Sequence, residues 1–360
     1  MPKVTFGIIV LNGEPFTRYC LRALYPFAHE IIVVEGGHED TRAVATADGH
    51  SVDGTLDVLR RFCAEEDPEQ KVTIVTKDGF WTKKDELGQC RTAQSRAYAE
   101  RATGDYLWQV DIDEFYLADD MRRLLEMLAC DPDITAVSVR QRSFWGSPDI
   151  EVHGWPLRRG LDAVHRLFRW APEYRYVTHE PPTVVDSAGR DLRTLKWIQP
   201  ADLVRRGIYL YHYSLLFPWQ VEQKTRLYKD ENPAAYGGMV DWAEASFFTL
   251  GNPYRVHNLY EWPSWLTRYL GDHPKEVLRM MDDVASGRVH VAVRDNNDAY
   301  RLLDSRFYRA GAMALACLDY VDRGRLRFGR IPGKLRRAPR RIMCELRSTG
   351  RVRRWRGYPH

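Results

Sequence analysis

The sequence lacks long hydrophobic runs and closely spaced cysteines. No apolar segment approaches the ~20 residues that a membrane-spanning helix needs, and the N-terminus has no signal peptide. The six cysteines lie far apart without a Cys-x-x-Cys pair, so a thiolate metal site is not expected. Internal repeats are absent, and the only biased segment is the Arg-rich end. These absences favour a protein of the reducing cytoplasm.

Charge is distributed unevenly along the chain. The 360 residues carry a formal net charge of +4, but residues 323–360 contain thirteen Arg, one Lys and a single acid, Glu345. This tail therefore carries +13 and the preceding chain −9. Such a tail predicts peripheral attachment to an anionic membrane surface, at ~1 kcal/mol per basic residue. Nucleic acid is the less expected polyanion, and a solvated tail without a partner is the third interpretation.

The stretch from Asp105 to Tyr116 carries the strongest chemical signal. Five residues of high strand preference, 106–110, are followed at once by Asp111, Asp113 and Glu114. Open α/β sheets bind ligands at the carboxyl ends of their strands. Because alternate residues of an extended segment point the same way, Asp111 and Asp113 can together hold a hard divalent cation.

The spacing of two aspartates is weak evidence by itself. Asp131-Pro132-Asp133 has the same spacing, but it follows a helical run and its proline suits a turn. The buried strand before Asp111 is what singles out the first copy. We therefore assign a metal and diphosphate role to the first copy only.

The periodicity predicts an α/β fold. Four strands alternate with three helices, which predicts a doubly wound, mostly parallel sheet flanked by helices. The expected strands are Val4–Val10, Glu30–Val34, Val72–Val75 and Tyr106–Val110. Beyond them, residues 134–142 read as a strand added at the sheet edge. Helical periodicity returns from Pro218 and includes residues 266–269.

This pattern divides the chain into three parts. We expect a catalytic domain over residues 1–217, with a nucleotide-sugar half (1–116) and an acceptor half (117–217). A C-terminal helical annex follows over 218–322, and the basic tail covers 323–360.

In combination, the motifs of the first ~215 residues resemble those of glycosyltransferase family 2, inverting enzymes of GT-A fold that use nucleotide sugars. The matching features are an apolar first strand, an acid closing the second strand, a Ser-x-Asp-Gly-Thr turn, a Gly-Asp-Tyr helix end and an Asp-x-Asp. Here they are Val4–Leu11, Glu35, Ser51–Thr55, Gly104–Tyr106 and Asp111–Asp113. An insertion from about His38 to His50 departs from the pattern.

Two further motifs narrow the resemblance. Arg166-Leu167-Phe168-Arg169 and His179-Glu180 are similar to bacterial members related to lipopolysaccharide-core glucosyltransferases. The resemblance implies polysaccharide biosynthesis and a glycan or lipid-linked acceptor.

The resemblance also implies roles for residues of the donor half. Glu35 would bind the nucleobase of a UDP- or GDP-linked hexose, and Asp53 would help to bind the nucleotide sugar. Asp111 would lie near the ribose and the metal, and Asp113 would bind Mn²⁺ or Mg²⁺. Arg91 would pair with the diphosphate, although a surface ion pair explains it equally well.

The acceptor half offers a base and a third metal ligand. Glu180 follows a strand there and is our choice for the general base, with Glu151 or Asp149 as rivals and loop ordering as the structural alternative. His212 could complete the metal shell, but a lone histidine among aromatic residues is more often packed in a core.

We therefore expect a metal-dependent, inverting hexosyltransferase. Two other functions are consistent with the sequence: a sugar-1-phosphate nucleotidyltransferase, and a non-enzymatic protein that binds polyanions through its tail. Against the former, the loop after the first strand, 12–15, is short and acidic rather than basic.

Overall fold

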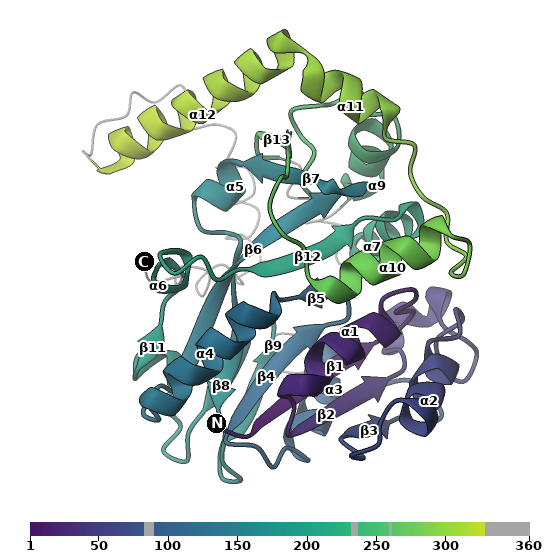
Figure 1. Ribbon diagram of the computed structural model, residues 1–360, viewed down its shortest axis with the longest axis vertical. Coiled ribbons are helices and arrows are strands. Elements are labelled where there is room, and N and C mark those ends of the chain that lie inside the picture. Colours follow the sequence, from purple (N-terminus) through teal and green to yellow (C-terminus); the bar gives the residue numbers. More distant parts are fainter. Residues whose placement is uncertain (83–89, 232–236, 259–260, 328–360) are drawn as a thin grey trace.

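The computed structural model describes residues 1–82, 90–231, 237–258 and 261–327 (Figure 1). Within these residues, eleven strands form one sheet and two form a hairpin. The sheet contains β1 (Val4–Val10), β2 (Glu30–Glu35), β3 (Val72–Val75), β4 (Tyr106–Asp111), β5 (Glu114–Phe115), β6 (Ala136–Trp145), β7 (Ser147–Gly154), β8 (Ala163–Arg169), β11 (Trp197–Ile198), β12 (Leu210–Leu215) and β13 (Ser264–Arg268). The hairpin contains β9 (Arg175–His179) and β10 (Pro182–Val185).

Helices cover both faces of the sheet. The complete set of helices in the described residues is α1 (Thr17–Leu24), α2 (Thr55–Glu65), α3 (Arg91–Ala99), α4 (Ala118–Cys130), α5 (Trp155–Arg158), α6 (Pro200–Val204), α7 (Pro218–Glu231), α9 (Met239–Trp242), α10 (Lys275–Ala285), α11 (Asn297–Asp304) and α12 (Arg306–Arg327). Short helical turns are η1 (Tyr25–Phe27), η2 (Glu39–Val44), η3 (Leu192–Thr194) and η4 (Ala243–Phe248).

The predicted α/β fold with a mostly parallel sheet is confirmed. The main path of the sheet runs β13-β7-β6-β8-β4-β1-β2-β3, and the four strands from β4 to β3 are all parallel. β8 pairs antiparallel with β4 and β6, so antiparallel pairing along this path begins where β8 joins β4. All four predicted strands of the first half are present. Their carboxyl ends meet at one edge of the sheet.

Two expectations for the second half are wrong. The strand predicted at the sheet edge is β6, which lies inside the sheet and contacts β7, β8, β11 and β12. Residues 264–268, within a region predicted to be helical, form β13 and pair antiparallel with β7. The annex therefore extends the sheet as well as adding helices.

Apolar residues on opposite faces of the sheet form separate core clusters. On one face, alternate residues of β1 and β4 pack with α1, α2, α4 and α10, including Phe6, Trp108 and Leu124. On the other face, residues of β2 and β4 pack with α3 and the β9-β10 hairpin, including Leu107 and Tyr176. This two-sided burial explains why β1 and β4 read as almost continuous apolar runs.

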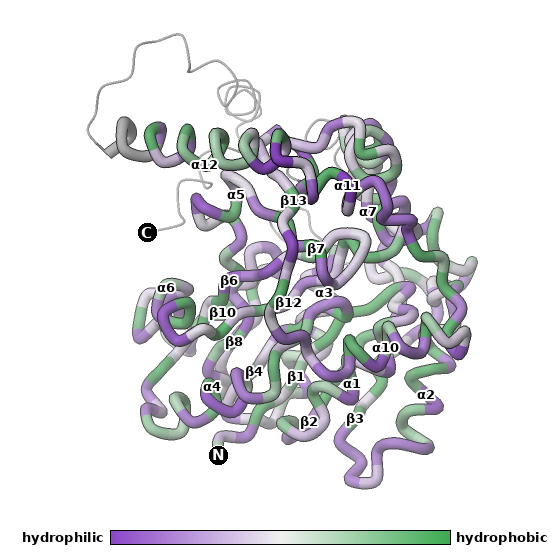
Figure 2. The backbone as a smooth tube through the Cα atoms, turned by 45° about the horizontal axis from the view of Figure 1, so that its top comes forward, coloured by the Kyte–Doolittle hydropathy of each residue, from purple (hydrophilic) through white to green (hydrophobic). Residues whose placement is uncertain are grey.

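A third core cluster joins the annex to β7 and β12. It includes Trp145 from β6, Trp265 from β13 and Tyr308 from α12. α12 lies across one end of the molecule, beyond β7 and β13 (Figures 1 and 2). It continues to Arg327, past the predicted start of the basic tail at 323. Across the described ranges, no helix has the length and apolar character needed to cross a bilayer.

Candidate functional site

Three carboxylates gather where β4 ends. Asp111 is the last residue of β4, and Glu114 begins the two-residue strand β5, which pairs with β12. Asp113 and Glu114 are buried, whereas Asp111 is partly exposed. The backbone N–H of Asp111 donates to Glu114 Oε2 at 3.1 Å, which closes the turn. The acidic residues therefore sit at the carboxyl edge of the parallel strands, as predicted.

A buried arginine bridges two of these carboxylates. Arg166 on β8 donates from Nη2 to Asp111 Oδ2 at 2.7 Å and also to Glu114 Oε1. Burial raises the pKa of Asp111, but Arg166 outweighs it and holds this pKa below its usual value. For Glu114, burial outweighs Arg166 and the pKa rises to about 7. Arg166 thus keeps Asp111 ionised at the edge of the site.

Asp113 faces a second pair of cationic or potentially cationic groups. Lys224 Nζ on α7 donates to Asp113 Oδ2 at 2.6 Å, and His212 Nε2 on β12 lies 3.5 Å from Asp113 Oδ1. Burial raises the pKa of Asp113, but Lys224 and His212 outweigh it, so the pKa lies well below its usual range. Asp113 is therefore a permanently ionised, nearly buried carboxylate.

The donor set at Asp113 fits a hard divalent ion. The carboxylates of Asp111 and Asp113 and the imidazole of His212 are ligand types that suit Mn²⁺. The ammonium of Lys224 already shows that the second oxygen of Asp113 accepts a cation partner. The structure thus places His212 beside Asp113, while Asp111 is turned toward Arg166, and the role of His212 as a metal ligand stays a prediction.

A separate cluster of possible metal ligands lies outside this site. Among the described residues, it is the only set of three His, Cys, Asp or Glu side chains whose ligand atoms all lie within 4.8 Å of one another. It consists of His38, Asp40 and Cys90. Cys90 Sγ lies 3.6 Å and His38 Nδ1 3.7 Å from Asp40 Oδ2. His38 and Asp40 belong to the insertion after β2, and Cys90 precedes α3.

Glu35, the predicted nucleobase ligand, is completely buried at the end of β2. Its Oε1 accepts from Ser51 N and Ser51 Oγ, both at 2.8 Å, and its Oε2 lies 2.9 Å from His50 Nδ1 and accepts from Thr76 at 3.1 Å. The insertion therefore folds back to seat Ser51 on Glu35. The carboxylate of Glu35 therefore holds the end of the insertion against β2, and its contact with a nucleobase stays a prediction.

Asp53 holds the loop that follows β1. Its Oδ2 accepts from Glu14 N at 2.9 Å, and its Oδ1 accepts from Thr55 Oγ1 at 2.6 Å. Thr55 Oγ1 in turn accepts from Gly13 N at 2.7 Å. The predicted nucleotide-sugar ligand Asp53 thus fixes the β1 loop to the start of α2, at the same edge as Asp113.

Glu14 in this loop makes folding sensitive to pH. Burial, together with the charge of Asp53, raises the pKa of Glu14 from 4.5 to about 7. The native state therefore keeps a proton that the unfolded chain releases, so stability should fall as pH rises from about 4.5 to 7. We expect the free energy of unfolding of Glu14→Gln to exceed that of wild type by about 1–3 kcal/mol above pH 7. Below pH 4.5 the two proteins should be equally stable, and urea unfolding measures both values.

The control for this prediction is Glu65→Gln, which removes an exposed carboxylate on α2. It should leave the pH profile of the unfolding free energy as in wild type. A Glu14→Gln protein whose advantage is equal at all pH values would show that Glu14 titrates normally in the folded chain.

Arg91 and Glu180 lie together. Arg91 Nη1 is 3.8 Å from Glu180 Oε2, and Glu180 is largely exposed in the turn between β9 and β10. His179, just before it, is buried, and its Nδ1 lies 2.8 Å from Ser95 Oγ. Burial lowers the pKa of His179 to about 3, although the charge of Asp111 acts in the opposite direction. Glu180 thus lies beside Arg91, in the turn that follows the buried His179.

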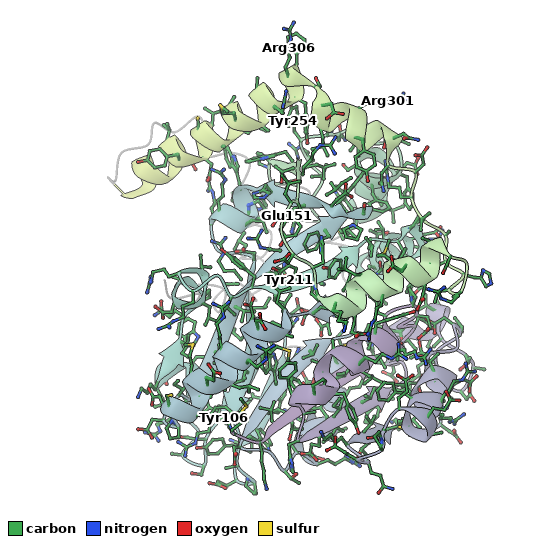
Figure 3. The ribbon with its side chains drawn as sticks, viewed as in Figure 1. Tyr106, Glu151, Tyr211, Tyr254, Arg301 and Arg306 are labelled. Carbon is green, nitrogen blue, oxygen red and sulfur yellow. The ribbon has the colours of Figure 1, made fainter. Side chains whose placement is uncertain are left out.

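The rival bases have structural partners. Glu151 accepts from Arg142 Nη1 at 3.0 Å and lies 3.1 Å from His153 Nε2. Asp149 accepts from Tyr300 OH at 3.0 Å, which ties β7 to α11. Figure 3 places Glu151 between Tyr211 and α12. Asp149 therefore helps to join the annex to the sheet, whereas the Glu151 side chain is held by residues of β6 and β7.

Two cavities differ in their relation to this chemistry. A cavity of about 40 Å³ lies beside the carboxylate site and is lined by residues that include His212 and Lys224. A larger one, of about 430 Å³, lies at the opposite ends of the strands, against Asp105, Tyr106 and Arg169. We place the candidate site at the smaller cavity, because the convergent charged groups are there.

Sequence reasoning missed two residues that define the site. Lys224 lies far along the chain on a helix assigned to the annex, and no local pattern marks it. Arg166 was noted only as part of a motif, without a partner.

No family model matches the chain, and no curated protein sequence matches it. Its fold is similar to that of several solved structures. They include residues 1–349 of TarS from S. aureus (13% identity, TM-score 0.37, 71% of this chain and 74% of that one) and the mannosyltransferase PcManGT from Pyrobaculum calidifontis with GDP-Man and Mn²⁺ (17%, 0.39, 88% and 84%).

The matched length differs among these structures. With UDP-bound TarS the chain spans only 37% of that protein's length, at a TM-score of 0.30. The match to glucosyl-3-phosphoglycerate synthase from Mycobacterium tuberculosis, bound to Mn²⁺, UDP and phosphoglyceric acid, has 14% identity and a TM-score of 0.26. It covers 39% of this chain and 43% of that one. One of these neighbours is a mannosyltransferase by name, TarS has also been solved with UDP-GlcNAc, and the synthase holds Mn²⁺ and UDP. Identities and TM-scores this low transfer no ligand or substrate to the present chain.

Proposed function

We propose that the protein is a metal-dependent glycosyltransferase of the family 2, GT-A type that transfers a hexose from a UDP- or GDP-linked donor. The observation that carries this proposal is the nearly buried Asp113 at the end of β4, which faces His212 and Lys224. A buried carboxylate surrounded by cationic or neutral nitrogen ligands at a sheet edge is suited to a cation and a diphosphate.

Each residue has a task in this mechanism. Asp113, His212 and Asp111 would hold Mn²⁺ or Mg²⁺, which when bound neutralises charge on the leaving diphosphate. Arg166 keeps Asp111 ionised and aimed at the edge. Lys224, whose side chain is partly exposed, would supply a positive charge beside Asp113. These groups favour departure of the nucleotide by electrostatics rather than by proton transfer.

Inversion requires one carboxylate that deprotonates the acceptor hydroxyl. We assign this to Glu180, because it is exposed in the turn after β9 and lies beside Arg91. Arg91, which lies beside Glu180, would bind the diphosphate. The nucleotide half is then residues 1–116, and the acceptor half is 117–217 with Lys224 added from the annex.

The acceptor is proposed to be a glycan or a lipid-linked sugar at the inner face of a membrane. The support is the charge of residues 323–360, which is +13 and would attract anionic lipids. Attachment by charge alone should be released by high salt, which vesicle binding at increasing salt concentration measures.

The test of the enzyme class is a thermal-shift panel with UDP, GDP, dTDP and CMP, each with and without Mn²⁺. A nucleotide at about a hundred times its dissociation constant should add ~2.7 kcal/mol of stability. We expect one nucleotide to raise the melting temperature only with metal. Glu180→Gln should show the same shift but lose sugar transfer from the matching donor.

Other results would redirect the assignment. If no nucleotide stabilises the protein, the acidic strand end is structural. Pyrophosphate released from a nucleoside triphosphate and a sugar phosphate would indicate a nucleotidyltransferase instead. Full transfer by Glu180→Gln would return the base to Glu151 or Asp149.

A further inference from the structure

Helix α12 presents a continuous apolar face to solvent. Phe307 and Tyr320 are each 75% exposed and Met313 is 69% exposed, and Leu318 and Val321 are also exposed. Successive helical residues are turned by about 100°, which places these five side chains within one half of the helix circumference. Large apolar side chains gathered on one exposed face indicate a surface that binds something.

This face carries no acidic residue. Its ten exposed positions are Arg306, Phe307, Arg309, Ala310, Met313, Ala314, Cys317, Leu318, Tyr320 and Val321. The two aspartates of this part of the helix face the protein, where Arg159 binds Asp319 at 3.0 Å and Asp322 at 2.6 Å. The outward face is therefore apolar apart from two arginines, and the aspartates of the helix lie on the side that faces the protein.

The opposite side of α12 is fixed to the body. Tyr308 is buried; its hydroxyl donates to Pro253 O at 3.0 Å and accepts from Leu266 N at 2.8 Å. Trp155 Nε1 donates to Leu315 O at 3.0 Å. Because these contacts set the rotation of the helix, its apolar face must point outward. Figure 2 shows hydrophobic residues recurring along α12 at this end of the molecule.

We propose that the outward face of α12 lies in the interface of an anionic lipid bilayer. Apolar side chains flanked by arginines are typical of helices that lie flat in the headgroup region. Arg306 extends away from the body at the start of α12 (Figure 3), and thirteen arginines follow from Arg323 onward. A protein partner would need acidic residues at the positions opposite these arginines. An anionic bilayer instead presents negatively charged headgroups along the whole length of the helix.

This inference rests on the membrane attachment proposed for the basic tail and adds the apolar half of the anchor. Charge brings the tail to the surface and is screened by salt. Insertion of Phe307, Met313 and Leu318 is not screened and fixes the side of the protein that faces the bilayer. The sheet edge with the carboxylates would then hold one orientation relative to the membrane.

The test uses the full chain and co-sedimentation with vesicles of phosphatidylglycerol and phosphatidylcholine, or of phosphatidylcholine alone. The variant is Phe307→Ser with Met313→Ser and Leu318→Ser. We expect at least tenfold weaker partitioning onto the anionic vesicles, with the remainder lost at high salt. The matched control replaces three exposed apolar residues elsewhere, Leu270, Leu278 and Val293, by serine and should bind as wild type.

Three results would overturn the proposal: no binding of wild type to anionic vesicles, unchanged binding by the α12 variant, or equal loss in the control. Size-exclusion chromatography with light scattering provides the remaining test. If the α12 variant converts a dimer to a monomer, the face joins two copies of this chain. The nucleotide-dependent melting shift should be the same in all three proteins, so failure of the anchor is separable from failure of the enzyme assignment.

Discussion

Asp113→Asn should abolish metal-dependent sugar transfer, with a loss of about a thousandfold. The expected cause is removal of the ionised oxygen that binds the cation, and a thousandfold corresponds to about 4 kcal/mol of transition-state stabilisation. The fold should survive, because Lys224 is partly exposed and can be solvated once its partner is neutral. Transfer from the donor selected in the nucleotide panel, measured against Mn²⁺ concentration, tests this expectation.

The chain supplies a matched control for this substitution. Asp133 occupies the second position of the other Asp-x-Asp sequence but lies exposed after α4. Asp133→Asn removes the same charge in the same local pattern and should retain wild-type transfer. If both variants are active, the cluster at the end of β4 is structural. If both are inactive, loss of net charge rather than of a ligand explains the effect.

Arg166→Met should destabilise the protein more than Asp113→Asn does. We expect it to lower the free energy of unfolding by about 3–5 kcal/mol. The substitution leaves Glu114 without its buried ion-pair partner and Asp111 without the group that orients it. Removing one partner of a buried pair is costly because the carboxylate left behind must either stay charged without a partner or take up a proton. Urea unfolding followed by circular dichroism measures the change, and transfer activity should fall with it because Asp111 is no longer held at the site.

Two further variants separate charge from packing. Arg166→Met combined with Glu114→Gln should recover part of the lost stability, since the uncompensated charge is gone. Arg205→Met breaks an exposed pair with Asp202 and should cost at most about 1 kcal/mol. A double variant as unstable as Arg166→Met alone would assign the loss to packing around the arginine stem.

The features that the sequence predicted well are those that depend on neighbouring residues. The strand before Asp111 and the spacing of Asp111 and Asp113 follow from local strand preference and the two-residue period of a strand. The parallel first half of the sheet follows from alternation of strands and helices. The same alternation places Glu35, which ends β2, and Asp53, which precedes α2, at the carboxyl edge of the sheet.

The features that the sequence did not predict depend on contacts between distant segments. Residues 134–142 were predicted to form a strand at the sheet edge, but Ala136, Val137 and Val139 are all buried and β6 lies between neighbouring strands. β13 is five residues long, too short for period alone to decide. The pairing of Arg166 with Glu114 joins β8 to β5, and no local rule chooses that partner.

The contact between Lys224 and Asp113 has a consequence for how the protein exists before it meets its substrates. A nearly buried carboxylate needs a counter-ion, and here the polypeptide provides one from its own helix α7. The chain can therefore complete folding in the absence of any divalent ion. When a cation arrives it competes with an internal ammonium rather than filling a bare negative site. Under the proposed function, affinity for the ion would be lower than the carboxylate alone would give, which would favour exchange of metal together with nucleotide at each turnover.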